Sequence, residues 1–125
     1  MAKPKILAFA GSTRIDSFNK KLVKIAASGA REEGADVTLI DLRDFQMPTY
    51  DEDLERQEGL PTSAQKLKNL MLAHQGLLVS SPEYNSSISG VLKNTIDWVS
   101  RQSEGEISLA CFKDKVAGLI SASPG

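Results

Sequence analysis

Residues 5–22, KILAFAGSTRIDSFNKKL, decide the fold of this chain. They begin with a continuous apolar run, pass through a loop of glycine, serine and charged residues, and continue with helical periodicity. A continuous apolar run is typical of a strand that is buried on both faces of a parallel sheet. We therefore predict a strand over residues 4–10, which the loop GSTRIDSFN, residues 11–19, connects to a helix.

The segment from residue 18 to residue 33 has the period of an amphipathic helix. Its apolar side chains form one stripe, made of Phe18, Leu22, Ile25 and Ala26. We predict that this stripe packs against the sheet. Gly34 follows as a stop signal, because glycine accepts the left-handed backbone conformation with which many helices end.

Three more apolar runs and two more amphipathic segments follow. The runs cover residues 36–42, 76–81 and 115–121, and the amphipathic segments cover residues 62–74 and 89–101. We predict strands for the former and helices for the latter. The resulting β-α-β-α-β-α-β order predicts an α/β fold with right-handed crossovers, a doubly wound parallel sheet. A flavodoxin-like sheet of this kind has the strand order 2-1-3-4.

The two later helices carry signals of their own. Their apolar stripes consist of Leu67, Leu70 and Met71 in the first helix and of Leu92, Ile96 and Val99 in the second. Thr62 and Gln65 have the spacing of a capping box. Lys93 and Asp97 lie one turn apart on the outer side of the last helix, where they can pair.

The segment DFQMPTYDEDLERQEGLP, residues 44–61, is longer than most connections in such folds, and we predict it to be irregular. Two roles stay open for it. It covers a site or a neighbouring subunit, or it is an exposed loop without a further task.

The chain stops soon after the last predicted strand, which ends at Ser121. Folds of this kind continue with at least one more helix and often with a fifth strand. We expect residues 1–125 to form a single domain that lacks its C-terminal part, the fifth strand included. The last strand is then an open edge, which favours pairing with another molecule.

Composition and charge exclude several classes of function. The chain has 125 residues, 41% of them apolar, and a formal net charge of −1, which fits one soluble domain. A charge so close to zero predicts no nucleic-acid partner and no binding to an anionic membrane. The N-terminal apolar run is shorter than a signal peptide or a membrane span. We therefore expect a cytoplasmic protein.

The chain has one cysteine and one histidine, and we expect both to have structural roles. Cys111 is the only cysteine, which excludes an internal disulfide and a multi-cysteine metal site, and we expect it in the core. His74 is the only histidine and lies where a helix ends, so a partial positive charge there suits the helix dipole. No metal site is predicted.

Three loops of similar composition follow the first, third and fourth predicted strands. They are GSTRIDSFN, SPEYNSSISG and SASPG, all rich in glycine, serine, proline or asparagine. The carboxyl ends of parallel strands share one edge, and ligands bind there where the strand order reverses. Because these three strands are neighbours in the flavodoxin-like order, we predict that their loops are contiguous.

The first loop has the chemistry of an anion site. The N-terminus of the following helix presents unpaired N–H groups and a partial positive charge. Ser12, Ser17 and Asn19 add neutral donors, and Arg14 adds a fork suited to phosphate oxygens. An alternative stays open, in which Asp16 or Ser17 only caps the helix and Arg14 is solvated. The P-loop and Gly-x-Gly-x-x-Gly patterns are missing from the sequence, which leaves a mononucleotide phosphate.

The second loop can border a flat heterocycle. Pro82 stiffens the turn, Tyr84 offers an aromatic surface, and Asn85 is both donor and acceptor. An alternative stays open here too, in which the loop only turns into the next helix, with Glu83 in solvent and Tyr84 against the core.

Two segments resemble a known family. GSTRIDSFNKKL, residues 11–22, and SPEYNSSISGVLKNTIDWVSR, residues 81–101, are similar to the two signature segments of the NADPH-dependent FMN reductase-like family. This family comprises flavodoxin-fold quinone, chromate and azo-dye reductases. Ser89 stands where the family usually has proline, and we expect serine to cap the helix instead.

The resemblance implies a set of FMN-binding residues. It implies that the phosphate is held by Ser12, Arg14, Ser17 and Asn19, and that the isoalloxazine is bordered by Pro82, Glu83, Tyr84 and Asn85. It also implies that the last loop, with Ser121, Ser123 and Gly125, approaches the ring and the ribityl chain.

The resemblance further implies the activity. The chain is expected to be an FMN-dependent oxidoreductase that takes hydride from NADPH or NADH and reduces a small acceptor such as a quinone by ping-pong transfer. The flavin carries this chemistry, so no catalytic side chain is named. A homodimer or homotetramer is expected. Two rivals remain, a flavodoxin-type electron carrier and an inactive fragment of the reductase.

Overall fold

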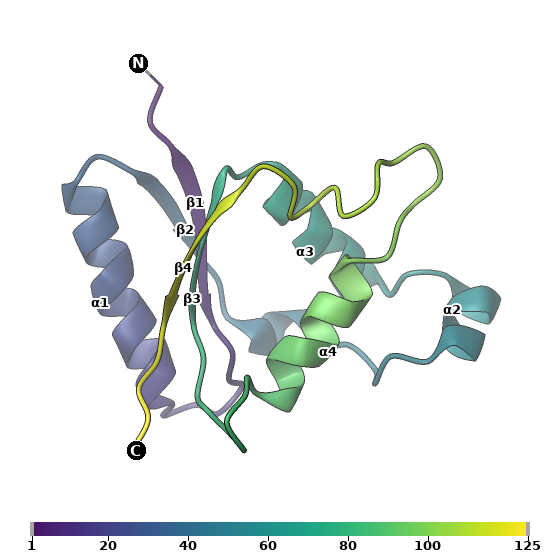
Figure 1. The fold of residues 1–125 in the computed structure, drawn as a ribbon, viewed down its shortest axis with the longest axis horizontal. Coiled ribbons are helices and arrows are strands. Elements are labelled where there is room, and N and C mark those ends of the chain that lie inside the picture. The colour runs from purple at the N-terminus through teal and green to yellow at the C-terminus, as the bar shows by residue number, and fades with distance from the viewer. Residues whose placement is uncertain (1, 125) are drawn as a thin grey trace.

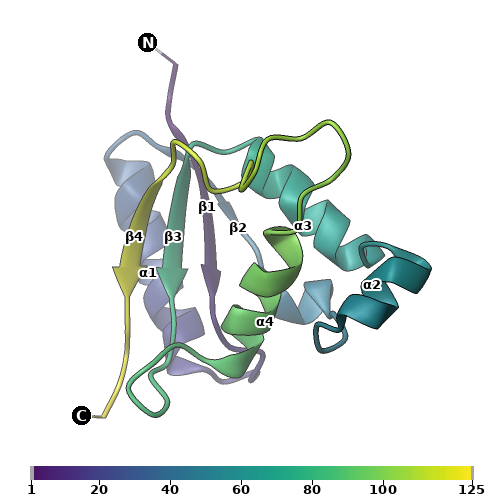
Figure 2. The ribbon, with the colours of Figure 1, turned by 45° about the vertical axis from the view of Figure 1, so that its right-hand side comes forward.

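The protein, described here over residues 2–124 in a computed structural model, has one four-stranded sheet. All four strands are parallel and lie side by side in the order β2-β1-β3-β4 (Figure 2). The strands are β1 Lys5–Ala10, β2 Asp36–Leu39, β3 Gly76–Ser80 and β4 Val116–Ile120. The flavodoxin-like order predicted for the sheet is confirmed, and each strand begins within one residue of its prediction.

Helices cover the sheet on two sides (Figure 1). The α-helices are α1 Phe18–Glu32, α2 Glu52–Glu58, α3 Thr62–Leu72 and α4 Gly90–Val99. α1 covers one face, and α3 and α4 cover the other (Figure 1). Successive side chains of β1 alternate between two cores: Leu7 and Phe9 belong to the core under α3 and α4, and Ala8 and Ala10 belong to the core under α1.

The buried face of α1 differs from the predicted stripe. The side chains that face the sheet are Asn19, Val23 and Ala27, spaced by four residues, while Phe18 is 67% and Ile25 is 70% exposed. The prediction was wrong because it followed the larger apolar residues. β1 contributes Ala8 and Ala10 to this core, and α1 turns its smaller side chains, Val23 and Ala27, toward it. The end of α1 is as predicted, since Gly34 has a φ of +98°.

The segment of residues 44–61 was predicted to be irregular. The prediction was wrong, because this segment contains α2. β2 also ends three residues earlier than predicted, and a short 3₁₀ helix, η1, covers Leu42–Phe45. Asp51 caps α2 by accepting a hydrogen bond from the Asp53 N–H. Acidic side chains in the first turn favour this helix through its dipole. The sequence DEDLERQEG thus carried a helix signal that its length and polarity concealed.

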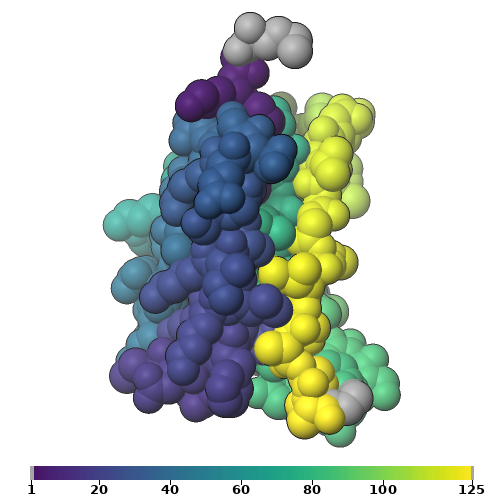
Figure 3. Space-filling view, turned by 90° about the vertical axis from the view of Figure 1, so that its left-hand side faces the viewer, coloured from purple at the N-terminus to yellow at the C-terminus, as the bar shows by residue number. Residues whose placement is uncertain are grey.

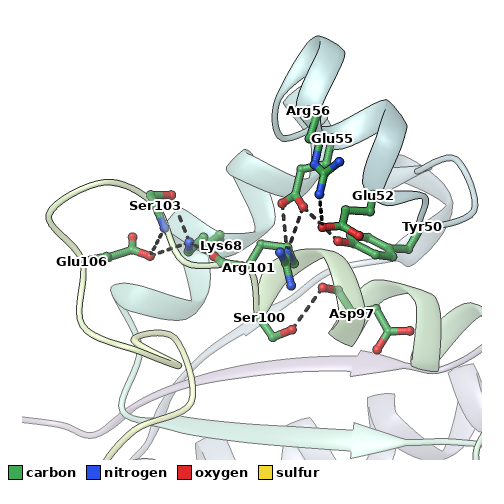
Figure 4. A network of polar contacts seen from close by, with 10 residues as sticks. All are labelled: Tyr50, Glu52, Glu55, Arg56, Lys68, Asp97, Ser100, Arg101, Ser103 and Glu106. Atoms are coloured by element: carbon green, nitrogen blue, oxygen red, sulfur yellow. Dashed lines mark hydrogen bonds and ion pairs between the residues drawn. The ribbon is translucent and has the colours of Figure 1, made fainter.

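Polar contacts hold the segment before and within α2 against α4 (Figure 4). The Trp98 indole N–H donates to the Pro48 carbonyl at 2.7 Å, and its ring meets the Tyr50 ring edge-on at 4.8 Å between centroids. Glu55 pairs with Arg101 at 2.9 Å and accepts a hydrogen bond from the Tyr50 hydroxyl at 2.9 Å. The long connection between β2 and α3 is therefore anchored to the body of the protein.

A buried lysine holds the chain after α4. Lys68 of α3 is 1% exposed and donates to the Arg101 carbonyl at 2.6 Å and to the Ser103 hydroxyl at 3.2 Å (Figure 4). Its ammonium also pairs with Glu106 at 2.5 Å. Three partners compensate the cost of burying this charge.

The N-cap predicted for α3 is wrong, and the N-cap predicted for α4 is confirmed. The Thr62–Gln65 capping box is wrong, because Pro61 occupies the N-cap position and the Gln65 amide donates to Asn69 instead. Ser89 caps α4 as predicted, accepting from the Leu92 N–H at 3.2 Å. The predicted Lys93–Asp97 pair is present at 2.6 Å. The apolar stripes predicted for both helices pack into one core.

β4 is one of the two edge strands of the sheet, and most of its residues are exposed. The prediction that every strand is buried on both faces fails here, since Val116 is 79% and Leu119 is 76% exposed. β4 pairs with β3 alone and runs along the side of α1 (Figure 3). An open edge at this strand was predicted from the sequence.

His74 and Cys111 are both structural. Cys111 is buried in the core, as predicted, and burial raises the pKa of its thiol. His74 follows α3 as predicted, but it is buried, with one ring nitrogen on the Leu70 carbonyl and the other on the Thr38 hydroxyl. Among residues 2–124, no helix combines the length and the apolar character that crossing a bilayer requires.

Candidate functional site

The three loops predicted to be contiguous meet at the carboxyl edge of the sheet (Figure 2). The Gly11 N–H donates to the Ser80 carbonyl at 2.8 Å, and the Ser89 hydroxyl donates to the Gly11 carbonyl at 2.5 Å. A Cβ at Gly11 would lie 2.9 Å from the Ser81 hydroxyl oxygen and 3.1 Å from the Leu92 Cβ, so a larger residue would force these side chains to shift. The Ser81 N–H in turn donates to the Ile120 carbonyl at 3.1 Å.

These loops enclose a hollow of about 170 Å³. Residues of all three loops and of the first turn of α1 line it: Ser12, Arg14, Ser17, Phe18, Asn19, Pro82, Glu83, Tyr84, Ala122, Ser123 and Pro124. Most of the residues singled out from the sequence therefore share one hollow. We call it the three-loop hollow.

Two of the predicted site residues lie outside the three-loop hollow, and a third is not among the described residues. Asn85 is exposed at the tip of the second loop and does not line the three-loop hollow. Ser121 lines a neighbouring hollow together with Pro82 and Glu83. Gly125 lies outside the described residues. Conversely, Phe18 lines the three-loop hollow and was assigned to the core from the sequence, although its position directly after the helix cap could have indicated the site.

One end of the three-loop hollow is suited to an anion. Ser17 caps α1 by accepting a hydrogen bond from the Lys20 N–H at 3.3 Å, so its own hydroxyl proton stays available to a ligand. The Ser12 hydroxyl accepts from the Arg14 N–H at 3.3 Å in the same way. The Arg14 guanidinium lies 5.7 Å from the centre of the Phe18 ring. Ser17 thus caps the helix, as the alternative interpretation of this loop predicted, and it also lines the hollow. Arg14 lines the hollow and is exposed to solvent.

Asn19 makes its bonds within the protein. It is 3% exposed, and its Oδ1 accepts from the Ser80 hydroxyl at 2.7 Å and from the Ala122 N–H at 2.9 Å. Its Nδ2 donates to the Ala122 carbonyl at 3.2 Å. These bonds tie the third loop to α1, and one amide proton remains for a ligand.

The second loop is a tight turn. Tyr84 and Ser87 exchange two backbone hydrogen bonds, and the residues between them, Asn85 and Ser86, have φ values of +54° and +64°. Asparagine tolerates this conformation better than most residues. The Glu83 carboxylate accepts from the Ser86 N–H at 2.8 Å and from the Ser123 hydroxyl at 3.2 Å. Glu83 therefore joins the second loop to the third, and Tyr84 is left on the rim.

A larger hollow, of about 660 Å³, lies on the other side of the first loop, between α1 and the end of β2. It receives no residue from the second or third loop. Its most buried charged group, Lys20, is paired with Asp41 at 2.9 Å. We favour the three-loop hollow as the site, because its cationic group, Arg14, faces the hollow without such a carboxylate partner among the ion pairs of residues 2–124.

The chemistry offered by the three-loop hollow is recognition rather than acid–base catalysis. Its donors suit a phosphate group, and Tyr84 offers a flat apolar surface nearby. Across residues 2–124, no group of three or more His, Cys, Asp and Glu side chains is placed to hold a metal ion.

Comparison with known proteins agrees with this geometry. The family model described as NADPH-dependent FMN reductase matches residues 4–125. An NAD(P)H-dependent FMN reductase of Pseudomonas aeruginosa is 36% identical over 121 residues, which cover 97% of this chain and 60% of the relative. A quinone reductase of Escherichia coli is 36% identical over 103 residues, which cover 79% of this chain and 52% of the relative.

A solved structure shows the same fold. It is FerB, a flavoenzyme NAD(P)H:(acceptor) oxidoreductase from Paracoccus denitrificans, with a TM-score of 0.76 and 32% identity over 98% of this chain and 62% of that chain. The chain spans between half and two thirds of the length of the curated relatives named here. With the sheet order, the converging loops and the family match in agreement, this chain belongs to the NADPH-dependent FMN reductase family.

Proposed function

We propose that the protein is an FMN-dependent NAD(P)H oxidoreductase that reduces quinones or similar small acceptors. The observation that carries the proposal is the three-loop hollow, in which Arg14, the N-terminus of α1 and the Tyr84 loop face one space. The names of the relatives support it, because they include an FMN reductase and a quinone reductase.

The residues present fit FMN at its phosphate end. A phosphate monoester carries a charge of about −1.5 to −2 at pH 7, which one guanidinium and a helix N-terminus can balance. The three-loop hollow, about 170 Å³, is smaller than a pocket of ~300–1,000 Å³ that encloses a whole drug-sized ligand. It therefore suits the phosphate and part of the ribityl chain, and the ring would extend over the open side.

Charge defines which end of the three-loop hollow holds the phosphate. The Glu83 carboxylate lies on the second loop and repels an anion, whereas Arg14 and the start of α1 attract one. In our proposal Ser12, Arg14, Ser17 and the remaining amide proton of Asn19 bind the phosphate. Pro82, Glu83 and Tyr84 border the ring, and residues 122–124 approach it from the third loop.

The chemistry follows from this assignment. Bound FMN would supply hydride transfer, from NAD(P)H first and to the acceptor afterwards, in ping-pong order. The protein binds and orients the ring and leaves one side open to both substrates. Tyr84, which is 59% exposed on the rim, provides an apolar contact, and no side chain is assigned a proton-transfer step.

We also propose a cytoplasmic homodimer or homotetramer. Large apolar side chains on the surface support an assembly, among them Ile15, Phe18, Val116 and Leu119. The segment of residues 47–55 is a candidate contact. Light scattering on the purified protein measures the mass of the assembly, and a monomeric mass would contradict this part of the proposal.

The absorption spectrum of the purified protein, with identification of the released flavin, tests the proposal. We expect FMN, and steady-state oxidation of NADPH or NADH with a quinone. A protein that retains FMN but oxidises neither nucleotide is an electron carrier instead. A protein that retains no flavin and takes up none from solution contradicts the proposal.

A further inference from the structure

The first loop is held from behind by residues that lie outside the three-loop hollow. The Thr13 carbonyl accepts hydrogen bonds from the Arg43 guanidinium at 2.9 Å and from the Lys20 ammonium at 3.4 Å. Arg43 belongs to η1 and Lys20 to α1, so the two donors reach the same oxygen from different elements. The Arg43 bond is short and charge-assisted and the Lys20 contact is longer, so Arg43 contributes more to fixing the direction of this carbonyl.

Asp41 organises both donors. Its Oδ2 pairs with Lys20 at 2.9 Å, and its Oδ1 accepts from the Arg43 backbone N–H at 2.9 Å. Burial raises the pKa of the Asp41 carboxyl, but the Arg43 N–H and the Lys20 ammonium outweigh this effect, so the pKa lies below its usual value. Asp41 is therefore ionised at neutral pH and keeps Lys20 and Arg43 beside the loop.

The direction of the Thr13 carbonyl determines the position of the Arg14 backbone. In a trans peptide, the carbonyl of one residue and the N–H of the next point in opposite directions within one plane. The Thr13 carbonyl points to Arg43 and Lys20, and the Arg14 N–H points to the Ser12 hydroxyl at 3.3 Å. The plane is thus held on both sides, and the Cα atom of Arg14 is placed before any ligand binds.

Other carbonyls of this loop are engaged in the same manner. The Gly11 carbonyl accepts from the Ser89 hydroxyl, and the Arg14 carbonyl accepts from the Ser17 N–H at 3.3 Å. A loop whose carbonyls are bound by the protein turns fewer negative dipoles toward an anion. Pre-organised N–H groups, and an arginine whose backbone is already placed, then bind the anion at a lower entropic cost.

We propose that Lys20 and Arg43 are positioning residues for the phosphate of FMN, and that they act through the Thr13 carbonyl without contacting the ligand. This inference rests on the proposed function. It assigns a task to η1, the 3₁₀ helix that follows β2.

The test compares FMN with riboflavin, which has the same ring and lacks the phosphate. Arg43→Ala should weaken FMN binding about tenfold, the order of one charge-assisted hydrogen bond, and leave riboflavin binding unchanged. Lys20→Met should act in the same direction and keep the packing of the alkyl chain. Arg43→Lys, which retains a cationic donor, should recover part of the loss. Arg56→Ala, which removes an exposed cation on α2, is the matched control.

Two further measurements separate positioning from charge and from folding. The loss of FMN affinity in Arg43→Ala should be the same at about 50 and at about 500 mM salt. A loss caused by long-range attraction between Arg43 and the phosphate would instead become smaller at the higher concentration, because salt screens that attraction. Amide hydrogen exchange at Arg14 should be faster in flavin-free Arg43→Ala than in the flavin-free parent protein. Unchanged FMN binding, an equal loss for riboflavin, or a loss that salt abolishes would each overturn the inference.

The failure of this inference differs from the failure of the proposed function. If the parent protein does not prefer FMN to riboflavin, the phosphate site itself is wrong. The exchange rate at Arg14 still decides in that case whether Arg43 positions the loop, because it is measured without a ligand.

Discussion

Asn19 and Ala122 are bound to each other by two hydrogen bonds, although 103 residues separate them in the sequence. The Asn19 side chain donates to the Ala122 carbonyl at 3.2 Å and accepts from its N–H at 2.9 Å. The Asn19 side chain thus joins α1 to the backbone of the loop that follows β4. This pair closes one side of the three-loop hollow.

Asn19→Ala should lower the free energy of unfolding by about 1–3 kcal/mol, because the fully buried Ser80 hydroxyl loses its acceptor and Ala122 loses both partners. Urea denaturation measures the change. Asn69→Ala, at an exposed amide of α3, is the control and should stay within about 0.5 kcal/mol of the parent protein. Equal effects of the two substitutions would show that the Asn19 bonds add no stability.

Arg14→Ala should weaken the binding of FMN by about tenfold or more and leave riboflavin unaffected, since the guanidinium is assigned to the phosphate. Arg14→Lys should retain part of the affinity, because lysine keeps the charge but not the fork. Fluorescence titration with each flavin provides the constants. Lys24→Ala removes a cation from the exposed side of the same helix and serves as the control. FMN affinity that is unchanged in Arg14→Ala would remove the phosphate assignment.

Ser86→Gly should raise the free energy of unfolding by about 0.5 kcal/mol. Ser86 has a φ of +64°, which costs a residue with a Cβ atom about 1–2 kcal/mol, and the greater chain entropy of glycine offsets part of the gain. The substitution also creates Asn-Gly, the pair preferred in tight turns with two positive φ values. Thermal and urea unfolding test it against Ser87→Gly, next to the turn. A loss of stability in Ser86→Gly would contradict the turn geometry.

The free energy of unfolding should decrease at acidic pH, in part because Glu55 becomes protonated. A hydrogen bond from Arg101 holds the pKa of Glu55 below its usual value, against the opposing effect of burial. A carboxyl with a lowered pKa in the folded state stabilises the protein above its unfolded pKa, about 4.3, and the contribution is lost as the pH falls through the lower folded value. Glu55→Gln should therefore flatten the dependence of the urea midpoint on pH between about 5 and 3.

The control for this experiment is Glu58→Gln, at the exposed end of the same helix. It should leave the slope in acid as it is in the parent protein. The same slope in Glu55→Gln and in the parent would show that the Arg101 pair does not contribute to acid sensitivity.

The local signals in the sequence were sufficient for the elements and their order. Apolar runs placed all four strands, and Ser89 and Gly34 marked helix ends that the structure confirms. The two signature segments were sufficient for the family. These signals succeed because helix ends, strand runs and loop composition depend on residues that are close in sequence.

The loops of the site were predicted as a group, and their internal bonding was not. The sequence indicated Asn19 as a donor to a ligand, whereas the structure uses most of its amide to hold Ala122 and Ser80. Thr13 and Arg43 carried no signal, since their contact joins a backbone carbonyl to a side chain 30 residues away.

By itself the sequence determined the β/α order, the parallel sheet and the edge at which the loops gather, because periodicity and turn chemistry are local. The tertiary structure alone decided which face of α1 is buried, that residues 52–58 form a helix against α4, and which side chains hold the first loop. The reason is that a side chain is buried or bonded according to the surface presented to it, and that surface is built from residues distant in the sequence.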